Sequence, residues 1–392
     1  MNEILNLEIN EMAQTQFDCS CGRQHNFSIH DIAMGSGVIS ELPRFAKPFI
    51  DGKILMVFDQ NTYRVAGEKA LNLMKDEGFN VKELLFDTGD DILIPDESTL
   101  GRILEEQDLD VSLMVSVGSG VLNDSVKFVS SRTKVPYIIV CTAPSMDGYL
   151  ADGAPIMKAG QKLSPVATLA YGVIGDTEVM KNAPMDLIEA GFGDVVGKIT
   201  ALSDWDLSVK NTGEYRCDTS VELVNRALEK CFSKADLLPK RDEEAILYLI
   251  EALSLTGVAM GLVNLSRPAS GAEHMLSHYW EMDYVARGVT PIHHGTQVGV
   301  ASTIIADFFV EMADLLPEGV VIPERAYIEG LLKKAGCPTS PVELGITREL
   351  FLNSLLHGYK VRPRYSIMQF AKDEGRLEDI AHKITNKLYG EE

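Results

Sequence analysis

Two histidines lie four residues apart in the segment SGAEHMLSHYW, residues 270–280, of a chain that has only eight histidines. Side chains at positions i and i+4 of a helix share one face, so a helix would place His274 and His278 on the same side. The segment is not an HExxH motif, because Met-Leu-Ser stands between the histidines. The pair is therefore either part of a metal site or a structural pair of polar residues.

Three possible metal ligands lie near predicted helix starts in the second half of the chain. His274 follows Gly271, His294 precedes a glycine in PIHHGTQVGV, and Asp194 lies in EAGFGDVVGK. One carboxylate and two imidazoles suit a divalent metal that keeps a coordination position open for substrate. The residues alone leave the structural alternative open.

A glycine turn in the first half could hold phosphate. In SVGSGVLNDSVKF, Gly118, Ser119 and Gly120 follow an apolar run and precede a helical pattern, where backbone N–H groups and a helix N-terminus can bind an anion. Asn123 occupies the third glycine position of GxGxxG, which favours an ordinary tight turn over a phosphate site. Asp59 ends the first apolar run, residues 53–59, and could bind ribose hydroxyls or cap the following helix.

The pattern around these residues predicts two kinds of domain. Apolar runs at 53–59, 81–86, 109–117 and 135–141 alternate with helical spacing, which predicts a Rossmann-like parallel sheet covered on both faces. From about residue 183 onward the pattern is helical. We therefore predict an α/β dinucleotide-binding domain over 1–182 and an all-helical domain over 183–392, with the cleft between them as the expected site.

Composition excludes some functions. The net charge of −21 argues against nucleic-acid or membrane-surface binding, although a few local basic groups could still hold a phosphorylated substrate. The apolar run 245–265 contains Glu251, Ser254 and Thr256, which favours a helix buried in the helical domain over a membrane span. The N-terminus shows no basic region followed by an apolar core, so we expect a cytoplasmic protein.

The cysteines offer one further metal candidate. Segment 17–27, FDCSCGRQHNF, has the alternation of a β-hairpin and contains Cys19, Cys21 and His25. Their spacing is not CxxC and only three ligands are local, which favours a packed hairpin over a zinc site.

Several motifs together resemble one enzyme family. VGSGVLNDSVK, CTAPSMDGYLADGAP, AGFGDVVGK, RPASGAEHMLSHYWEM and HHGTQVGV occur in the order and spacing of the sn-glycerol-1-phosphate dehydrogenases, and the bacterial type looks closest. That family belongs with the glycerol dehydrogenases, iron-type alcohol dehydrogenases and dehydroquinate synthases. The resemblance extends from about residue 30 to RPRYSIM near the C-terminus.

The resemblance implies a role for each matching residue. Metal ligands would be Asp194, His274 and His294, and Asp147 and His278 would contact substrate, with Asp194 shared. The dinucleotide contacts that it implies are Asp59, Gly118, Ser119, Gly120, Val121, Leu122, Thr142, Ala143, Pro144 and Ser145. Leu150 and Ala151 depart from the family pattern, which has a small residue and a serine after DGY.

The implied reaction is the NAD- or NADP-dependent interconversion of dihydroxyacetone phosphate and sn-glycerol 1-phosphate, with a divalent Ni or Zn ion as Lewis acid. A homodimer or larger homo-oligomer is expected. Candidate phosphate partners are Lys198, Arg267, Arg362 and Arg364. The alternatives are a glycerol dehydrogenase, a dehydroquinate-synthase-like cyclase, or a nucleotide-binding homologue without catalysis.

Overall fold

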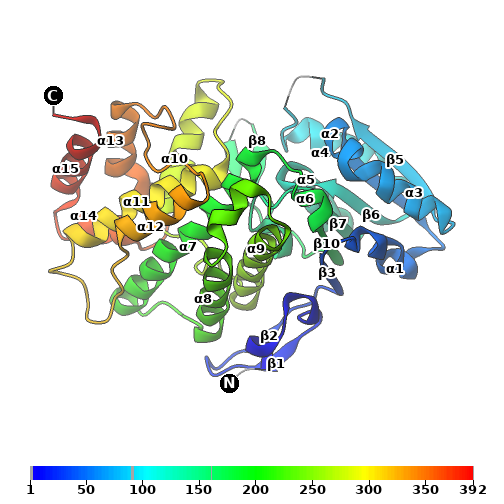
Figure 1. Cartoon of the computed structure of the whole chain (residues 1–392), viewed down its shortest axis with the longest axis horizontal. Coiled ribbons are helices and arrows are strands. Elements are labelled where there is room, and N and C mark those ends of the chain that lie inside the picture. Colours follow the sequence, from blue (N-terminus) through cyan, green and yellow to red (C-terminus); the bar gives the residue numbers. More distant parts are fainter. Residues whose placement is uncertain (1–2, 90–91, 160, 392) are drawn as a thin grey trace. The chain divides into compact units, whose positions relative to one another are not determined.

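The computed structural model describes residues 3–89, 92–159 and 161–391 (Figure 1). The chain forms two compact units. The first contains Met1–Pro184 together with Arg241–Leu262, and the second contains Met185–Lys240 and Val263–Glu392.

A six-stranded sheet forms the centre of the first unit, and each neighbouring pair of strands is parallel. The strand order is β3-β10-β7-β6-β4-β5. After β4 the chain runs to the edge strand β5 and returns as β6 on the other side of β4, so the topology switches direction between β4 and β6. The strands are β3 Asp31–Gly35, β4 Lys53–Asp59, β5 Asn80–Phe86, β6 Val111–Gly118, β7 Tyr137–Cys141 and β10 Gly172–Asp176.

The parallel sheet confirms the predicted fold class, and the sequence located four of its strands. The other two, β3 and β10, were missed. Each has only five residues, and their sequences DIAMG and GVIGD include charged or glycine ends. Such short runs lack the continuous apolar length by which a buried strand is recognised.

Helices and two small strand pairs complete the first unit. The hairpin predicted at 17–27 is present as antiparallel β1 and β2, in which Phe17 pairs with His25. These elements are β1 Gln16–Asp18, β2 Gln24–Asn26, β8 Ile156–Lys158, β9 Gln161–Leu163, α1 Leu42–Ala46, α2 Gln60–Thr62, α3 Glu68–Asp76, α4 Glu97–Glu106, α5 Gly120–Thr133, α6 Thr177–Met180 and most of α9 Glu243–Val263.

The second unit is helical, as predicted. Its core packs Trp280, Phe308, Phe309, Phe351 and Leu276 from several helices, all of them fully buried. The helices are α7 Met185–Thr212, α8 Asp218–Phe232, α10 Ala272–Ala286, α11 His294–Glu311, α12 Arg325–Lys334, α13 Arg348–His357, α14 Ile367–Asp373 and α15 Leu377–Tyr389.

Helix α9 is long and apolar enough to cross a membrane, but 78% of its most apolar window is buried inside the protein. The burial of this helix was predicted correctly. The sequence analysis assigned the helix to the C-terminal domain, whereas most of it belongs to the first unit. Glu243 accepts a hydrogen bond from Thr177 at 2.8 Å, and the Nζ atom of Lys181 is 2.9 Å from its carboxylate. A helix that is apolar on all sides shows that it is buried but not which neighbours bury it.

Candidate metal centre and dinucleotide site

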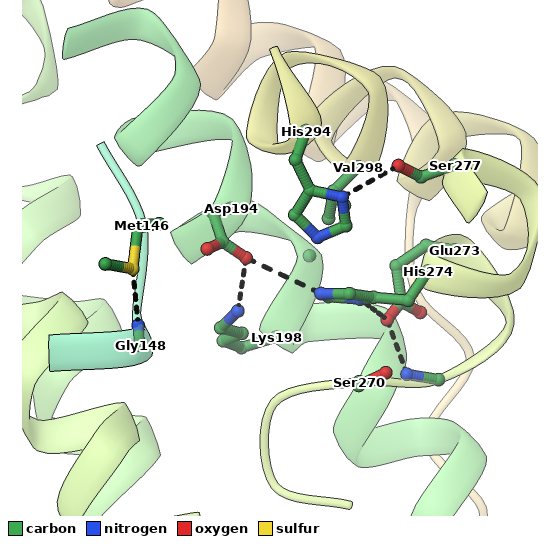
Figure 2. A network of polar contacts seen from close by, with 12 residues as sticks. Met146, Gly148, Asp194, Lys198, Ser270, Glu273, His274, Ser277, His294 and Val298 are labelled. Atoms are coloured by element: carbon green, nitrogen blue, oxygen red, sulfur yellow. Dashed lines mark hydrogen bonds and ion pairs between the residues drawn. The ribbon is translucent and has the colours of Figure 1, made fainter. Parts of the chain in front are cut away.

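Three side chains from three helices of the second unit converge on one point (Figure 2). They are Asp194 of α7, His274 of α10 and His294, the first residue of α11. One carboxylate oxygen and one nitrogen from each imidazole all lie within 4.8 Å of one another. Ligand atoms that share a zinc ion at roughly 2.1 Å lie roughly 3–4 Å apart, so small side-chain movements would complete the coordination.

The position of Asp194 differs from the sequence prediction. It does not lie at a helix start but inside the 28-residue helix α7, which begins at Met185. Three glycines in GFGDVVGK suggest a break, because glycine disfavours helix interiors. The helix continues through them, and two of the three, Gly193 and Gly197, face α11 at very short range.

Glycines of α7 and α11 allow the two helices to approach closely. A Cβ atom on Gly193 would lie 2.3 Å from the carbonyl oxygen of Gly295, and one on Gly299 would lie 2.9 Å from the Cα atom of Gly193. A Cβ atom on Gly295 would be only 2.9 Å from the Cβ of Asp194. The absence of side chains at these positions therefore brings the ligands of the two helices together.

Charge around Asp194 favours its ionised form. Burial alone would raise the pKa of Asp194, but Lys198 and the imidazoles of His274 and His294 hold it well below its usual range. The Nζ atom of Lys198 lies 2.6 Å from Oδ1 of Asp194, and both side chains are buried. Lys198, a candidate phosphate partner, thus contacts a metal-ligand candidate instead.

Glu273 orients His274. The Nδ1 atom of His274 donates to Oε1 of Glu273 at 2.7 Å, which leaves Nε2 to face Asp194 at 3.6 Å. Glu273 also accepts hydrogen bonds from the backbone N–H of Gly271 at 2.6 Å and from the hydroxyl of Thr200 at 2.8 Å. Carboxylates that hold the second nitrogen of a ligand histidine in this way fix its tautomer and direction.

Glu281 holds the other two histidines. It accepts from Nδ1 of His294 at 2.9 Å and from Nδ1 of His278 at 3.0 Å, one with each carboxylate oxygen. The two rings stack with centroids 5.1 Å apart. His278, Glu281 and His294 also satisfy the distance criterion for a metal group, but these hydrogen bonds already account for their proximity.

Sequence reasoning missed both carboxylates, and only one left a usable signal. Glu281 lies three residues after His278, so a helix places the two on the same face. Glu273 immediately precedes His274, and adjacent helix positions do not face each other. The contact between Glu273 and His274 forms beside the turn at Gly271, whose N–H also donates to Glu273. Residue spacing in the sequence does not reveal the conformation of that turn.

The glycine turn of the first unit has the features of an anion site. Ser119 caps α5 without a side-chain hydrogen bond, so the first N–H groups of α5 have no side-chain partner at that cap. A Cβ atom on Gly118 would lie 2.5 Å from a side-chain carbon of Leu122, which requires glycine there. The N–H of Thr142 donates to the carbonyl of Gly118 at 3.0 Å and joins the turn to the segment after β7.

A pocket of about 290 Å³ lies at the carboxyl ends of β4 and β6. Four of the predicted dinucleotide residues line it: Asp59, Ser119, Val121 and Leu122. Asp59 also caps α2, because its Oδ1 accepts from the N–H groups of Asn61 and Thr62, both at 2.8 Å. The capping alternative is therefore correct for Oδ1, while Oδ2 accepts no hydrogen bond within the described part of the chain.

Buried Lys127 supports the segment that contains Asp147. Its Nζ atom donates to the carbonyl oxygens of Gly148 at 2.6 Å and Gly153 at 3.0 Å. Burial lowers the pKa of Lys127, and nearby Asp124 and Asp152 oppose this effect. Asp152 follows Leu150 and Ala151, the two residues that depart from the expected sequence pattern. It acts partly as a counter-charge for Lys127.

Leu150 and Ala151 belong to the packed interior of the first unit. Leu150 is fully buried and Ala151 is 8% exposed. A Cβ atom on Gly257 of α9 would lie 3.0 Å from the Cβ of Leu150. The place of the family's usual small residue is therefore filled by an aliphatic side chain that packs against α9.

Comparison with known proteins identifies the family. The glycerol-1-phosphate dehydrogenase (NAD(P)+) of Bacillus licheniformis is 30% identical over 388 residues, which cover 96% of this chain and 97% of that protein. The chain belongs to the glycerol-1-phosphate dehydrogenase family. The enzyme of the same name from Bacillus velezensis is 31% identical, over 95% of this chain and 98% of that protein.

A family model and two solved structures give broader comparisons. A family model described as iron-containing alcohol dehydrogenase matches residues 32–184. The crystal structure of glycerol dehydrogenase from Schizosaccharomyces pombe superimposes with a TM-score of 0.67 at 18% identity, over 92% of this chain and 91% of that chain. Sulfoacetaldehyde reductase from Bifidobacterium kashiwanohense, solved with NAD+, gives a TM-score of 0.68 at 17% identity, over 90% and 96%. These structures share the fold.

Proposed function

We propose that the protein catalyses the NAD(P)H-dependent reduction of dihydroxyacetone phosphate to sn-glycerol 1-phosphate, and the reverse reaction. The observation that carries the proposal is the convergence of Asp194, His274 and His294 in a chain of this family. In the reduction, C2 gains a hydride from the nicotinamide and its oxygen gains a proton, so the ketone becomes an alcohol and NAD(P)H becomes NAD(P)+.

The donor set fits a divalent metal. Asp194 is held ionised, and the Nδ1 atoms of His274 and His294 donate to Glu273 and Glu281, so a lone pair on each Nε2 would bind the ion. When bound, Ni²⁺ or Zn²⁺ would supply Lewis acidity at the ketone oxygen. Two imidazoles and a carboxylate suit either ion and leave a position for substrate.

His278 is the proposed proton-transfer residue. Its Nδ1 atom donates to Glu281, so Nε2, which lies 2.8 Å from Nη2 of Arg362, is the atom that would exchange a proton with substrate or water. Asp147, in the first unit, is the proposed second substrate contact. The first unit would bind the dinucleotide through Asp59, the turn Gly118–Leu122 and the segment Thr142–Ser145. We further propose a cytoplasmic enzyme that forms homodimers or larger homo-oligomers.

Substrate comparison tests this proposal. NAD(P)H oxidation by the metal-loaded enzyme is measured with dihydroxyacetone phosphate and, separately, with dihydroxyacetone. We expect consumption with the phosphorylated ketone and a product that an sn-glycerol-3-phosphate-specific dehydrogenase does not oxidise. Consumption only with dihydroxyacetone would instead indicate a glycerol dehydrogenase, and consumption with neither would reject both assignments.

A further inference from the structure

Arg362 differs from its neighbours Arg267 and Arg364 in that, among the described residues, it donates to no oxygen atom. It is partly buried in the segment after α13, and within the described residues its one hydrogen bond runs from Nη2 to Nε2 of His278 at 2.8 Å. No described carboxylate lies within ion-pair distance of it. Because desolvating a charge is costly, buried guanidinium groups are normally paired with an anion.

The neighbouring arginines already have their partners. Arg267 donates to Glu214 through Nε at 2.8 Å and Nη2 at 2.5 Å, and through Nη1 to the carbonyl of Tyr365. Arg364 donates to the hydroxyl of Ser266 and to the carbonyl of Ser270. Both groups therefore hold the chain around the site together, although both were candidate phosphate partners in the sequence.

The three arginines also raise the local positive potential. Burial, together with the charges of Arg267 and Arg362, lowers the pKa of Arg364 to about 10. Among these three cations only Arg267 has a carboxylate of a described residue at hydrogen-bond distance. The carboxylates of Glu281 and Glu273 act on Arg362 only from a distance, so an anion placed beside it would meet a guanidinium that no described carboxylate contacts directly.

The position of Arg362 matches the geometry of the proposed substrate. Its guanidinium contacts His278, whose ring stacks on the metal-ligand candidate His294 at 5.1 Å. The cation is thus separated from the metal ligands by one imidazole ring. In dihydroxyacetone phosphate a methylene carbon and an ester oxygen separate the carbonyl carbon from phosphorus, so ketone and phosphate also need neighbouring but distinct sites.

We propose that Arg362 binds the phosphate of the substrate and thereby selects phosphorylated over free ketotriose. This inference rests on the proposed function. On binding, Arg362 would exchange its hydrogen bond with neutral His278 for charge-assisted bonds to phosphate oxygens, which are stronger. The exchange would also release Nε2 of His278, the atom assigned to proton transfer. An unphosphorylated ketone offers no such partner and leaves Arg362 on His278.

Binding of inorganic phosphate tests the site independently of turnover. The full chain is freed of metal with a chelator and saturated with NAD+, so that neither the ion nor the dinucleotide site captures the probe, and calorimetry measures the dissociation constant. Loss of a charge-assisted pair should weaken phosphate binding at least about 10-fold in Arg362→Gln. Arg287→Gln is the matched control, because Arg287 is exposed and pairs with Asp283 at the end of the same helix as His278.

Kinetics supply the second readout. In Arg362→Gln, KM for dihydroxyacetone phosphate should rise at least about 10-fold, so the ratio of kcat/KM for dihydroxyacetone phosphate to kcat/KM for dihydroxyacetone should fall. Arg362→Lys keeps the charge and should recover part of the affinity; it also serves if the glutamine variant does not fold. Wild-type affinity for phosphate in both variants would overturn the role of Arg362. If wild-type enzyme binds phosphate through Arg362 but does not reduce dihydroxyacetone phosphate, the proposed function fails and the phosphate site stands.

Discussion

At the scale of single residues, the histidines depend on carboxylates for their direction. Glu281 accepts from Nδ1 of both His278 and His294, and a glutamine in its place could accept from only one of them. Glu281→Gln should therefore weaken metal binding by about 10–100-fold, measured by competition with a coloured chelator. Glu222→Gln, at an exposed position of α8, is the control. Equal metal affinity in the wild type and Glu281→Gln would show that Glu281 does not orient His294.

Asp204 gives a second prediction at this scale, on pH dependence. Its carboxylate is fully buried and accepts from the N–H groups of Ala272 and Ile367, both at 2.6 Å. Burial, together with nearby Glu273, raises the pKa of Asp204 from 3.8 to about 7. The folded protein therefore binds a proton that the unfolded chain has lost between these pH values.

The direction in which folding stability changes with pH follows from that difference in the number of protons bound. Asp204 stabilises the fold fully below pH 3.8, and this contribution is lost as pH rises through about 7. Its size is on the order of a few kcal/mol, at about 1.4 kcal/mol per pKa unit. Chemical denaturation of the wild type and Asp204→Asn at pH 5 and pH 8 should show a smaller wild-type advantage at pH 8. A larger advantage at pH 8 would contradict the raised pKa.

At the scale of secondary structure, glycines set the distance between α7 and α11. A methyl group on Gly193 would meet the carbonyl oxygen of Gly295, a backbone atom that cannot rotate away. Gly193→Ala should therefore reduce the free energy of unfolding by about 1–3 kcal/mol and weaken metal binding, because Asp194 and His294 separate.

Gly330→Ala in α12 is the matched control for that substitution. A Cβ atom there would meet no atom within 4 Å, and alanine favours a helix, so stability should rise by about 0.5–1 kcal/mol. The measurements are urea denaturation and metal affinity. Unchanged metal affinity in Gly193→Ala would show that the contact between α7 and α11 does not determine the arrangement of the metal ligands.

The element scale also shows how far sequence could predict the site. Periodicity located α10 and α11, and the i, i+4 spacing correctly placed His274 and His278 on one helix. The same reasoning placed Asp194 at a helix start, because glycines in GFGDVVGK read as a break. Two of these glycines make a tertiary contact with α11, and local helix propensity does not predict tertiary contacts.

At the scale of the whole molecule, the chain builds two units that are not simple halves. The first unit takes residues 241–262 from the middle of the second half, so most of α9 packs with the parallel sheet's unit. The fold class followed from alternating strand and helix patterns. The sequence patterns did not show to which unit α9 belongs. Gly257 and Leu150 are more than a hundred residues apart in the chain, and only the folded structure brings them into contact.

The central claim is that Asp194, His274 and His294 hold one divalent ion that the reduction of dihydroxyacetone phosphate requires. Metal content per chain, measured on purified wild type and His274→Ala, tests it most directly, with NAD(P)H oxidation followed on the same samples. We expect a single Ni or Zn ion in the wild type, loss of ion and activity after chelation, and recovery on adding metal. In His274→Ala, metal content and activity should both be low and should not recover when metal is added. Full metal content in that variant, or full activity of the chelated wild type, would contradict the account.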